Sequence, residues 1–116
     1  MPFEKGEIIS FTFPNAWYGD WKVHSAVILS CEDGYKHDKL YVCAMMTSNG
    51  VNDIFSFPLT NNDLETSSNK DHSQVRCHLI TYVLEEDIHH SNPFNKLKKQ
   101  AFERLIAQIN VPVFDV

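Results

Sequence analysis

Five short strand-like runs, followed by one amphipathic run, limit most strongly the folds that this chain can adopt. The five runs are rich in β-branched and aromatic residues and are separated by segments that contain turn residues. Runs of this length with turn signals between them predict antiparallel β-strands. They cover residues 6–13, 24–31, 40–48, 54–60 and 73–84. Pro58 in the fourth run has no backbone N–H to donate, which predicts a strand at the edge of the sheet.

The single helical pattern lies near the end of the chain. Its apolar residues recur at four-residue spacing, at Leu97, Ala101, Leu105 and Ile109. This spacing predicts an amphipathic helix over about residues 96–109, and Asn95 is placed to cap its first turn. We therefore expect an α+β fold that is mainly β, in which a small, curved antiparallel sheet or barrel is closed by a C-terminal helix.

Length and charge narrow the classes of protein further. The 116 residues suit one domain, so we expect residues 1–116 to form a single unit. No apolar run is long enough to cross a bilayer and no signal-peptide pattern is present, so we expect a cytoplasmic protein without membrane contact. A net charge of −5 argues against broad, sequence-independent nucleic-acid binding, which requires an excess of Lys and Arg. A local basic groove remains compatible with this charge.

The cysteines and histidines give little indication of a metal site. Cys31, Cys43 and Cys77 are odd in number and form no C-x-x-C pair, so we expect reduced, buried thiols. His89 and His90 adjoin acidic residues, but consecutive side chains rarely converge on one ion. We therefore expect neither a bound metal nor another cofactor.

The fifth run contains the best candidate pair for chemistry. Alternate residues of a strand point to the same face. One face would therefore carry Gln74, Arg76, His78 and Ile80, and the other Val75, Cys77, Leu79 and Thr81. Arg is suited to hold a phosphate, and histidine side chains change charge near neutral pH. The pair therefore predicts either a phosphate site or the solvated outer face of a half-exposed strand.

Thr47 and Ser48 stand where the third run ends and a turn begins. Hydroxyl groups in such turns most often make local hydrogen bonds to the backbone. Together with the amides of the turn they can also hold a phosphate. The residue pattern leaves both interpretations open.

The segment between the first two runs is unusually aromatic for a connection. It contains Trp17, Tyr18 and Trp21, and Lys22 and His24 follow directly. Aromatic rings beside cations are typical of surfaces that bind single-stranded nucleic acid. Alternatively, the segment folds back, so that its rings cap the core or a dimer partner.

The order of the motifs resembles the PemK/MazF/Kid family of toxins over nearly the whole chain. The motifs are "KGEIISFTF", "HSAVILS", "VCAMMTS" and "SQVRCHLITYV", followed by the amphipathic helix. The resemblance implies a small SH3-like barrel that forms homodimers and acts as the toxin of a type II toxin–antitoxin system. It further implies metal-independent cleavage of single-stranded RNA, blocked by an antitoxin from the same operon. A CcdB-like relative with the same fold poisons DNA gyrase instead.

The resemblance also suggests site residues by position. Thr47 and Ser48 match the threonine–serine pair at the end of a family strand, and Arg76 matches the arginine of the Kid-type "VRCD". His78 stands where that type has an acidic base, and His24 stands where many members have an arginine. The loop "NAWYGDWK" also differs from the usual loop, which is rich in glycine and glutamine.

Metal-free RNA cleavage requires a base, an acid and positive charge at the phosphate. We expect His78 to deprotonate the 2′-OH, Arg76 to stabilise the phosphorane and His24 to protonate the leaving oxygen, while Thr47 orients the phosphate. Further RNA contacts are expected from Ser48, Lys22, Tyr18, Trp21 and Trp17. Two alternatives remain: a protein of this fold that binds RNA, gyrase or an antitoxin without cutting, and a domain whose polar strand face is merely solvated.

Overall fold

The computed structural model describes residues 3–15, 20–67 and 73–116, and it describes the backbone alone for residues 13–15 and 20–22. The chain folds into one antiparallel sheet of six strands in the order β4-β5-β3-β2-β1-β6. The strands are β1 (Glu7–Asn15), β2 (Asp20–Ile28), β3 (Leu40–Thr47), β4 (Ser56–Pro58), β5 (Gln74–Leu84) and β6 (Asn95–Lys96). The helices are α1 (Glu32–Asp38) and α2 (Lys99–Phe114), with 3-10 turns at Asn61–Asp63 and Glu85–Asp87. This mainly β architecture confirms the expected fold class.

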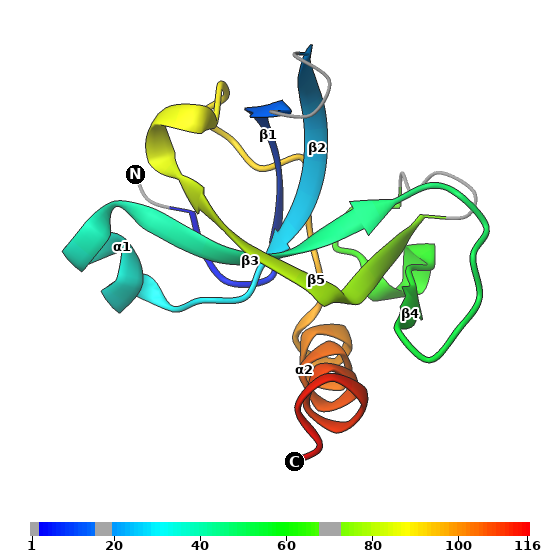
Figure 1. Ribbon diagram of the computed structural model, residues 1–116. Coiled ribbons are helices and arrows are strands. Elements are labelled where there is room, and N and C mark those ends of the chain that lie inside the picture. The colour runs from blue at the N-terminus through cyan, green and yellow to red at the C-terminus, as the bar shows by residue number, and fades with distance from the viewer. Residues whose placement is uncertain (1–2, 16–19, 68–72) are drawn as a thin grey trace.

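The sheet is strongly curled, and both of its faces are packed. In Figure 1 the β1–β2 hairpin stands upright, β3 and β5 cross below it, and α2 packs beneath that crossing. The cluster against α2 includes Val27 and Ala44, whereas their chain neighbours Ile28 and Cys43 belong to a second cluster on the opposite face. This division follows from the alternation of side chains along each strand.

Both edges of the sheet are formed by very short strands. β4 pairs with β5, and Pro58 faces Gln74 there, so the edge position predicted from Pro58 is confirmed. At the other edge, the two residues of β6 pair with Glu7 and Ile8 of β1.

Strand β5 departs from simple alternation, so part of the predicted division of its faces is wrong. Ala44 pairs with Ile80 and Met46 with Val75, which leaves residues 76–79 of β5 opposite a single residue of β3. Val75 is buried beneath α2, and Ile80 packs against the same cluster instead of sharing the polar face. Leu79, expected on the face of Val75, is 46% exposed. An irregularity of this kind reverses the face that later residues of the strand occupy.

Helix α2 begins later than predicted, and Asn95 does not cap it. Residues 95 and 96 pair with β1 instead, and Lys98 occupies the cap position. The Asn95 amide accepts a hydrogen bond from Thr66 N–H at 3.1 Å and donates one to Thr66 O at 2.8 Å. The Asn95 side chain therefore links the segment before α2 to the segment around Thr66 instead of capping the helix.

The remainder of α2 agrees with its apolar pattern. Ala101, Leu105 and Ile109 are buried, as the four-residue spacing predicts. The helix continues through Pro112 to Phe114, beyond the predicted end near residue 109. Among the described residues, no helix is both long and apolar enough to cross a membrane.

A second helix forms where the sequence suggested only a turn. Residues 32–38 form α1, in which Lys36 Nζ lies 3.6 Å from Glu32 Oε1, one turn away. The helix ends at Lys39, whose φ of 55° is left-handed. The polar composition of this segment reflects its exposure to solvent, because α1 contains no buried residue.

The aromatic segment is partly a continuation of the β1–β2 hairpin. Pro14 pairs with Trp21 and Phe13 with Lys22, so the backbone of Trp21 and Lys22 belongs to β2 and not to a loop. Residues 16–19, which include Trp17 and Tyr18, lie outside the described residues.

The two consecutive histidines attach the segment after β5 to β1. His90 Nε2 accepts a hydrogen bond from Ser10 N–H at 2.9 Å, and its Nδ1–H donates to Asn92 O at 2.6 Å. His89 Nε2 lies 2.7 Å from Thr12 Oγ1. Both imidazoles therefore contribute to the closure of the fold.

All three cysteines are free thiols, but their environments differ. Cys43 and Cys77 are buried, as predicted, and burial raises the pKa of Cys43 to about 12. Cys31 is exposed, so the prediction of a buried thiol is wrong at this position. The predicted strand ran to residue 31, but β2 ends at Ile28, and Cys31 lies in the connection directly before α1.

Candidate active site

Arg76 is the centre of a hydrogen-bonded cluster formed by β4, β5 and the loop before β4. Its Nη1 donates to Ser56 Oγ at 2.9 Å and to Gln74 Oε1 at 3.1 Å. Nη1 also lies 3.1 Å from Asp53 Oδ1, and Nη2 donates to Asp53 Oδ2 at 2.9 Å. The Arg76 side chain is 10% exposed. A solvated strand face is therefore the wrong description of Arg76, because the preceding loop closes over its guanidinium group.

Strand pairing explains why these groups meet. Ser56 of β4 stands directly opposite Arg76 of β5. Gln74 precedes Arg76 by two residues and therefore shares its face of β5. Gln74 and Ser56 are buried, so both need hydrogen-bond partners within the protein.

Asp53 balances the charge of Arg76 through a bidentate ion pair. Hydrogen bonding from Arg76 holds the pKa of the Asp53 carboxyl below its usual value, so the pair is charged at neutral pH. Oδ1 also accepts a hydrogen bond from Phe55 N–H at 2.9 Å, and the Asp53 N–H donates to Ser56 Oγ at 3.1 Å. The Asp53 side chain is nevertheless 40% exposed. Arg76 is thus nearly enclosed, and its counter-ion faces water.

The loop that carries Asp53 is fastened to the sheet and to α2. Gln74 Nε2 donates to Val51 O at 2.6 Å and to Asn49 O at 3.2 Å. From α2, Gln108 Nε2 donates to Ile54 O at 3.3 Å and to Ser56 O at 3.0 Å. These contacts fix the backbone on both sides of Asp53.

Thr47 lies beside this cluster at the end of β3. It pairs with Gln74 of β5 and therefore lies on the same face of the sheet as Gln74 and Arg76. Its Oγ1 accepts a hydrogen bond from Asn49 N–H at 3.3 Å, which is a local turn contact. Ser48 follows in the turn and is exposed. The structure thus brings Thr47 and Ser48 to the edge of the Arg76 cluster.

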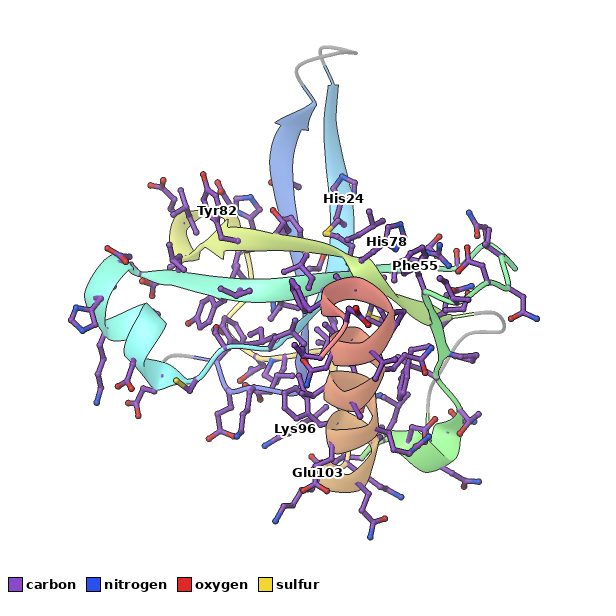
Figure 2. All side chains as sticks on the ribbon, turned by 60° about the horizontal axis from the view of Figure 1, so that its bottom comes forward. His24, Phe55, His78, Tyr82, Lys96 and Glu103 are labelled. Atoms are coloured by element: carbon purple, nitrogen blue, oxygen red, sulfur yellow. The ribbon has the colours of Figure 1, made fainter. Side chains whose placement is uncertain are left out.

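His78 is exposed and stacks on an aromatic ring. Its imidazole centroid lies 4.2 Å from that of Phe55, with 32° between the ring planes. In Figure 2, His78 and Phe55 lie next to each other on the opposite side of the sheet from the labelled residues Lys96 and Glu103. The two rings form a small aromatic surface beside the Arg76–Asp53 pair.

His24 lies on a different strand from the other candidate residues. It pairs with Phe11 of β1, and the two ring centroids are 5.8 Å apart. The pairing of β2 with β3 begins at Ala26, so His24 stands two residues beyond the point where these strands separate. By alternation it shares the face of Ala26, which is also the face of Thr47. His24 therefore occupies the same side of the curled sheet, on the diverging hairpin (Figure 2).

The other predicted RNA contacts concern the hairpin tip. Lys22 and Trp21 are placed only through the backbone of β2, and Trp17 and Tyr18 lie outside the described residues. Their contribution to a site remains a prediction.

Sequence reasoning missed Asp53 and Phe55. The only available signal was their position directly before the edge strand, in "NDIFSFP". Nothing in that pattern indicates that Asp53 reaches an arginine 23 residues further along the chain.

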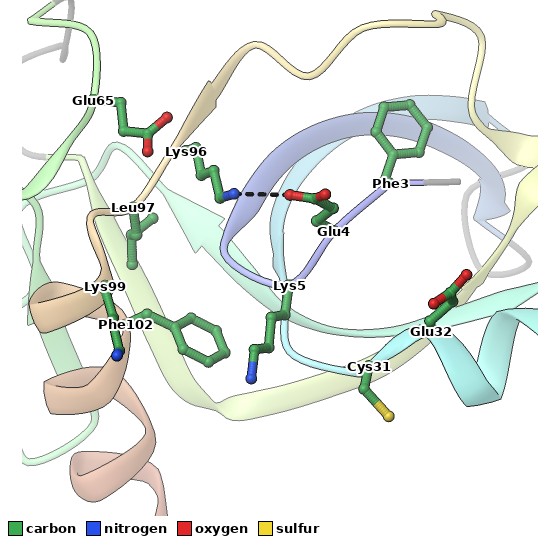
Figure 3. A pocket seen from close by; sticks show the side chains of 10 residues that line it. All are labelled: Phe3, Glu4, Lys5, Cys31, Glu32, Glu65, Lys96, Leu97, Lys99 and Phe102. Atoms are coloured by element: carbon green, nitrogen blue, oxygen red, sulfur yellow. Dashed lines mark hydrogen bonds and ion pairs between the residues drawn. The ribbon is translucent and has the colours of Figure 1, made fainter. Parts of the chain in front are cut away.

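A cleft of about 520 Å³ lies elsewhere, between the N-terminal segment and the start of α2. Lys96 Nζ and Glu4 Oε2 form an ion pair of 2.8 Å across it, and Lys5 Nζ lies 5.9 Å from the centroid of the Phe102 ring (Figure 3). Positive and negative side chains line this cleft in mixture. It is separate from the Arg76 cluster.

Comparison with known proteins gives a consistent family assignment. A family model described as the PemK-like, MazF-like toxin of type II toxin–antitoxin systems matches residues 4–111. No curated protein sequence matches the chain significantly.

Several solved structures share the fold at low sequence identity. The MazF toxin in a MazE–MazF complex from Deinococcus radiodurans has a TM-score of 0.74 at 11% identity, covering 98% of this chain and 97% of that chain. An endoribonuclease in complex with its cognate antitoxin, from a mycobacterial species, has a TM-score of 0.72 at 10% identity, covering 97% and 96%. The toxin MazF-mt6 of Mycobacterium tuberculosis has a TM-score of 0.66 at 16% identity, covering 93% and 97%.

Proposed function

The chain belongs to the PemK-like, MazF-like toxin family of type II toxin–antitoxin systems, and from this premise we propose that it cuts single-stranded RNA without a metal ion. One observation carries the proposal: Arg76 and Thr47, the residues that match the family motif, lie on one face of the sheet around Gln74. Cleavage of messenger RNA would stop translation and growth. We further propose that residues 1–116 act as one domain in the cytoplasm.

The reaction uses the 2′-OH of the RNA as its nucleophile. A base removes the 2′ proton, the oxygen attacks the adjacent phosphorus, the bond to the 5′-oxygen breaks, and an acid protonates that oxygen. The products are a 2′,3′-cyclic phosphate and a 5′-hydroxyl end. His78 is the base, since its exposed imidazole is open to substrate. His24 is the acid and approaches from the β1–β2 hairpin.

Arg76 stabilises the additional negative charge on the phosphorane, and Thr47 orients the phosphate. A guanidinium group that is held in place stabilises the more highly charged transition state more strongly than the ground state, by about 3–4 kcal/mol for a typical single donor. The exposed Ser48 adds a hydroxyl at the edge of the cluster.

The aromatic pair of His78 and Phe55 adjoins the phosphate site and gives a surface on which a base can stack. Lys22, Trp21, Tyr18 and Trp17 extend this surface along the hairpin and its tip. A neighbouring phosphate and two stacking surfaces suit a strand whose bases are unpaired.

The proposed protein partners are a second copy of the chain and a cognate antitoxin. One structure with this fold is described as a MazE–MazF structure, and another as an endoribonuclease in complex with its cognate antitoxin. An acidic, extended antitoxin segment would meet Arg76, Lys22 and the aromatic hairpin, and would thereby compete with RNA. In this arrangement the antitoxin and the RNA use the same face of the sheet.

A non-cleaving protein of the same fold is the second candidate function. The observation that favours it is the engagement of Arg76 by Asp53, because a neutralised guanidinium attracts phosphate less strongly. Such a protein would bind RNA, gyrase or an antitoxin through the same face.

The deciding experiment incubates the purified chain with a long single-stranded RNA in EDTA. Cleavage that leaves 2′,3′-cyclic phosphate ends is expected. RNA that remains intact but is retained by the protein would support the binding function instead. A requirement for a divalent ion would contradict the 2′-OH mechanism.

A further inference from the structure

We infer that Asp53 is an internal competitor for the phosphate of the substrate, so that RNA binding requires the Asp53 carboxylate to release Arg76. The inference rests on the proposed function for the identity of the competing anion. Its structural basis is the two-pronged pair between Arg76 and Asp53, with Nη1–Oδ1 at 3.1 Å and Nη2–Oδ2 at 2.9 Å.

Hydrogen bonds fill the edge of the Arg76 guanidinium that is formed by its two terminal nitrogens. Nη1 has two hydrogens but three acceptors around it, on Asp53, Ser56 and Gln74. Nη2 gives one of its two hydrogens to Asp53. A phosphate that takes the same two-pronged geometry must therefore replace the carboxylate, because both use one N–H of each terminal nitrogen.

Charge leads to the same conclusion. With Asp53 in place, the cluster is close to neutral, and an approaching phosphate meets a carboxylate that is 40% exposed. The carboxylate and the phosphate carry the same sign of charge and repel each other. Because Arg76 is largely buried, salt screens the charges at this site less than at an open surface. Asp53 therefore lowers the affinity of this site for any anion.

Release of Arg76 needs a change of the Asp53 side chain, not of the whole loop. The flanking backbone is fixed, since Gln108 holds Ile54 O and Cys77 N–H donates to Phe55 O at 2.9 Å. The partly exposed carboxylate can rotate into water and be hydrated there. Ser56 and Gln74 keep the guanidinium in position while the anions exchange.

The direct test compares wild type with Asp53→Asn. The amide keeps the shape of the side chain, and its oxygen can still accept from Phe55 N–H, but its negative charge is lost. Binding of a short fluorescent 2′-O-methyl RNA, which cannot be cut, is measured by anisotropy. Asp53→Asn should bind about three- to fivefold more tightly, the upper part of the range expected for the interaction of one partly exposed charge.

Asp38→Asn is the matched control for charge. It removes one negative charge from an exposed residue of α1. This helix directly precedes β3 and lies on the other side of the molecule from β4 (Figure 1). Its RNA affinity should stay within about twofold of wild type because the distance exceeds the screening length of the buffer. Asp53→Glu keeps the charge and should not reproduce the gain. Equal or weaker binding by a folded Asp53→Asn protein overturns the inference.

A second measurement separates this inference from the proposed function. Inorganic phosphate is titrated against protein with ¹⁵N-labelled arginine, and the Arg76 side-chain resonance is identified by its loss in Arg76→Lys. The resonance should shift at lower phosphate concentration in Asp53→Asn than in wild type. That result with RNA left uncut would reject the proposed function alone. Normal RNA cleavage with equal phosphate responses would reject the inference alone.

Discussion

At the scale of single residues, Arg76 serves both the fold and the proposed chemistry. Its guanidinium satisfies Gln74 and Ser56, which are 4% and 7% exposed, and it also pairs with Asp53. A planar group with five donors can support several acceptors at once, which a lysine cannot do in the same geometry. Substitutions of Arg76 are therefore expected to affect stability as well as activity.

Arg76→Ala should reduce RNA cleavage by about a hundred- to a thousandfold, the typical effect of losing one donor to the transition state. It should also lower the free energy of unfolding by about 1–3 kcal/mol, because Gln74 and Ser56 lose a partner. Cleavage in EDTA and urea unfolding monitored by circular dichroism measure the two effects. Arg76→Lys keeps the positive charge but lacks the planar guanidinium group. Its cleavage rate and its free energy of unfolding should lie between those of wild type and Arg76→Ala. Wild-type cleavage by folded Arg76→Ala would place the chemistry elsewhere.

His78→Ala should slow cleavage by about 10²- to 10⁴-fold, in a manner that depends on pH, because a general base is lost. The fold should be unaffected, since His78 is exposed and its described contact is with the Phe55 ring. The measurement is the cleavage rate from acidic to alkaline pH in EDTA. His37→Ala, another exposed histidine, on α1, is the control and should cut normally. An unchanged pH profile in His78→Ala would exclude His78 as the base.

At the scale of elements, Asp63 joins α2 to the loop after β4. Its carboxylate accepts hydrogen bonds from Thr60 N–H at 2.9 Å and pairs with Arg104 of α2, while its carbonyl accepts from Lys98 N–H at 2.8 Å. Burial alone would raise the pKa of Asp63, but hydrogen bonds from Thr60 and Arg104 outweigh it and lower the pKa. The ionised form therefore stabilises the start of α2.

Asp63→Asn should destabilise the protein at neutral pH and much less in acid. Because the folded-state pKa is depressed, this stabilisation is present above the unfolded value of about 3.9 and is lost as the pH falls through the folded value. Urea unfolding at pH 7 and at about pH 3 measures the difference between wild type and variant. Asp38→Asn, with no such partner described, should show little difference at either pH. If Asp63→Asn were equally destabilised in acid, the shape of the Asp63 side chain would matter and not its charge.

The sequence was informative about elements with strong periodicity. Five strand runs, the edge position of Pro58 and the buried face of α2 all follow from local patterns. The start of α2 was missed because Asn95 makes a tertiary contact with Thr66 that a cap pattern does not reveal. The helix α1 was missed because its exposed residues have no apolar period to detect.

The candidate site was only partly predictable for a similar reason. Arg76 and Thr47 were found through motifs within one run each. Asp53 reaches Arg76 only when β4 pairs with β5, and no spacing within the sequence encodes that long-range contact. The irregularity in β5 depends on its partner β3, so strict alternation assigned Ile80 and Leu79 to the wrong faces.

At the scale of the whole molecule, a homodimer is expected to bind one antitoxin segment across the RNA groove. An acidic antitoxin peptide should inhibit RNA cleavage competitively, raising the KM for RNA while the kcat stays constant. Light scattering at micromolar concentration should give the mass of two chains. A monomer would contradict the proposed assembly, and inhibition that lowers kcat alone would contradict a shared groove. A scrambled peptide of equal charge separates motif recognition from simple attraction.

The short edge strands have a consequence for the behaviour of the protein in a crowded cell. β4 is three residues long and contains Pro58, and β6 at the opposite edge is two residues long. Exposed strand edges offer unpaired backbone groups to which other chains can add, which leads to amyloid-like association. β4 and β6 themselves provide few consecutive backbone groups for such growth, but β4 pairs with residues 74–76 alone, so residues 78–84 of β5 have no neighbouring strand on that side among the described residues. Strand addition is therefore disfavoured at β4 and β6, and the uncovered length of β5 is the edge at which another chain would add.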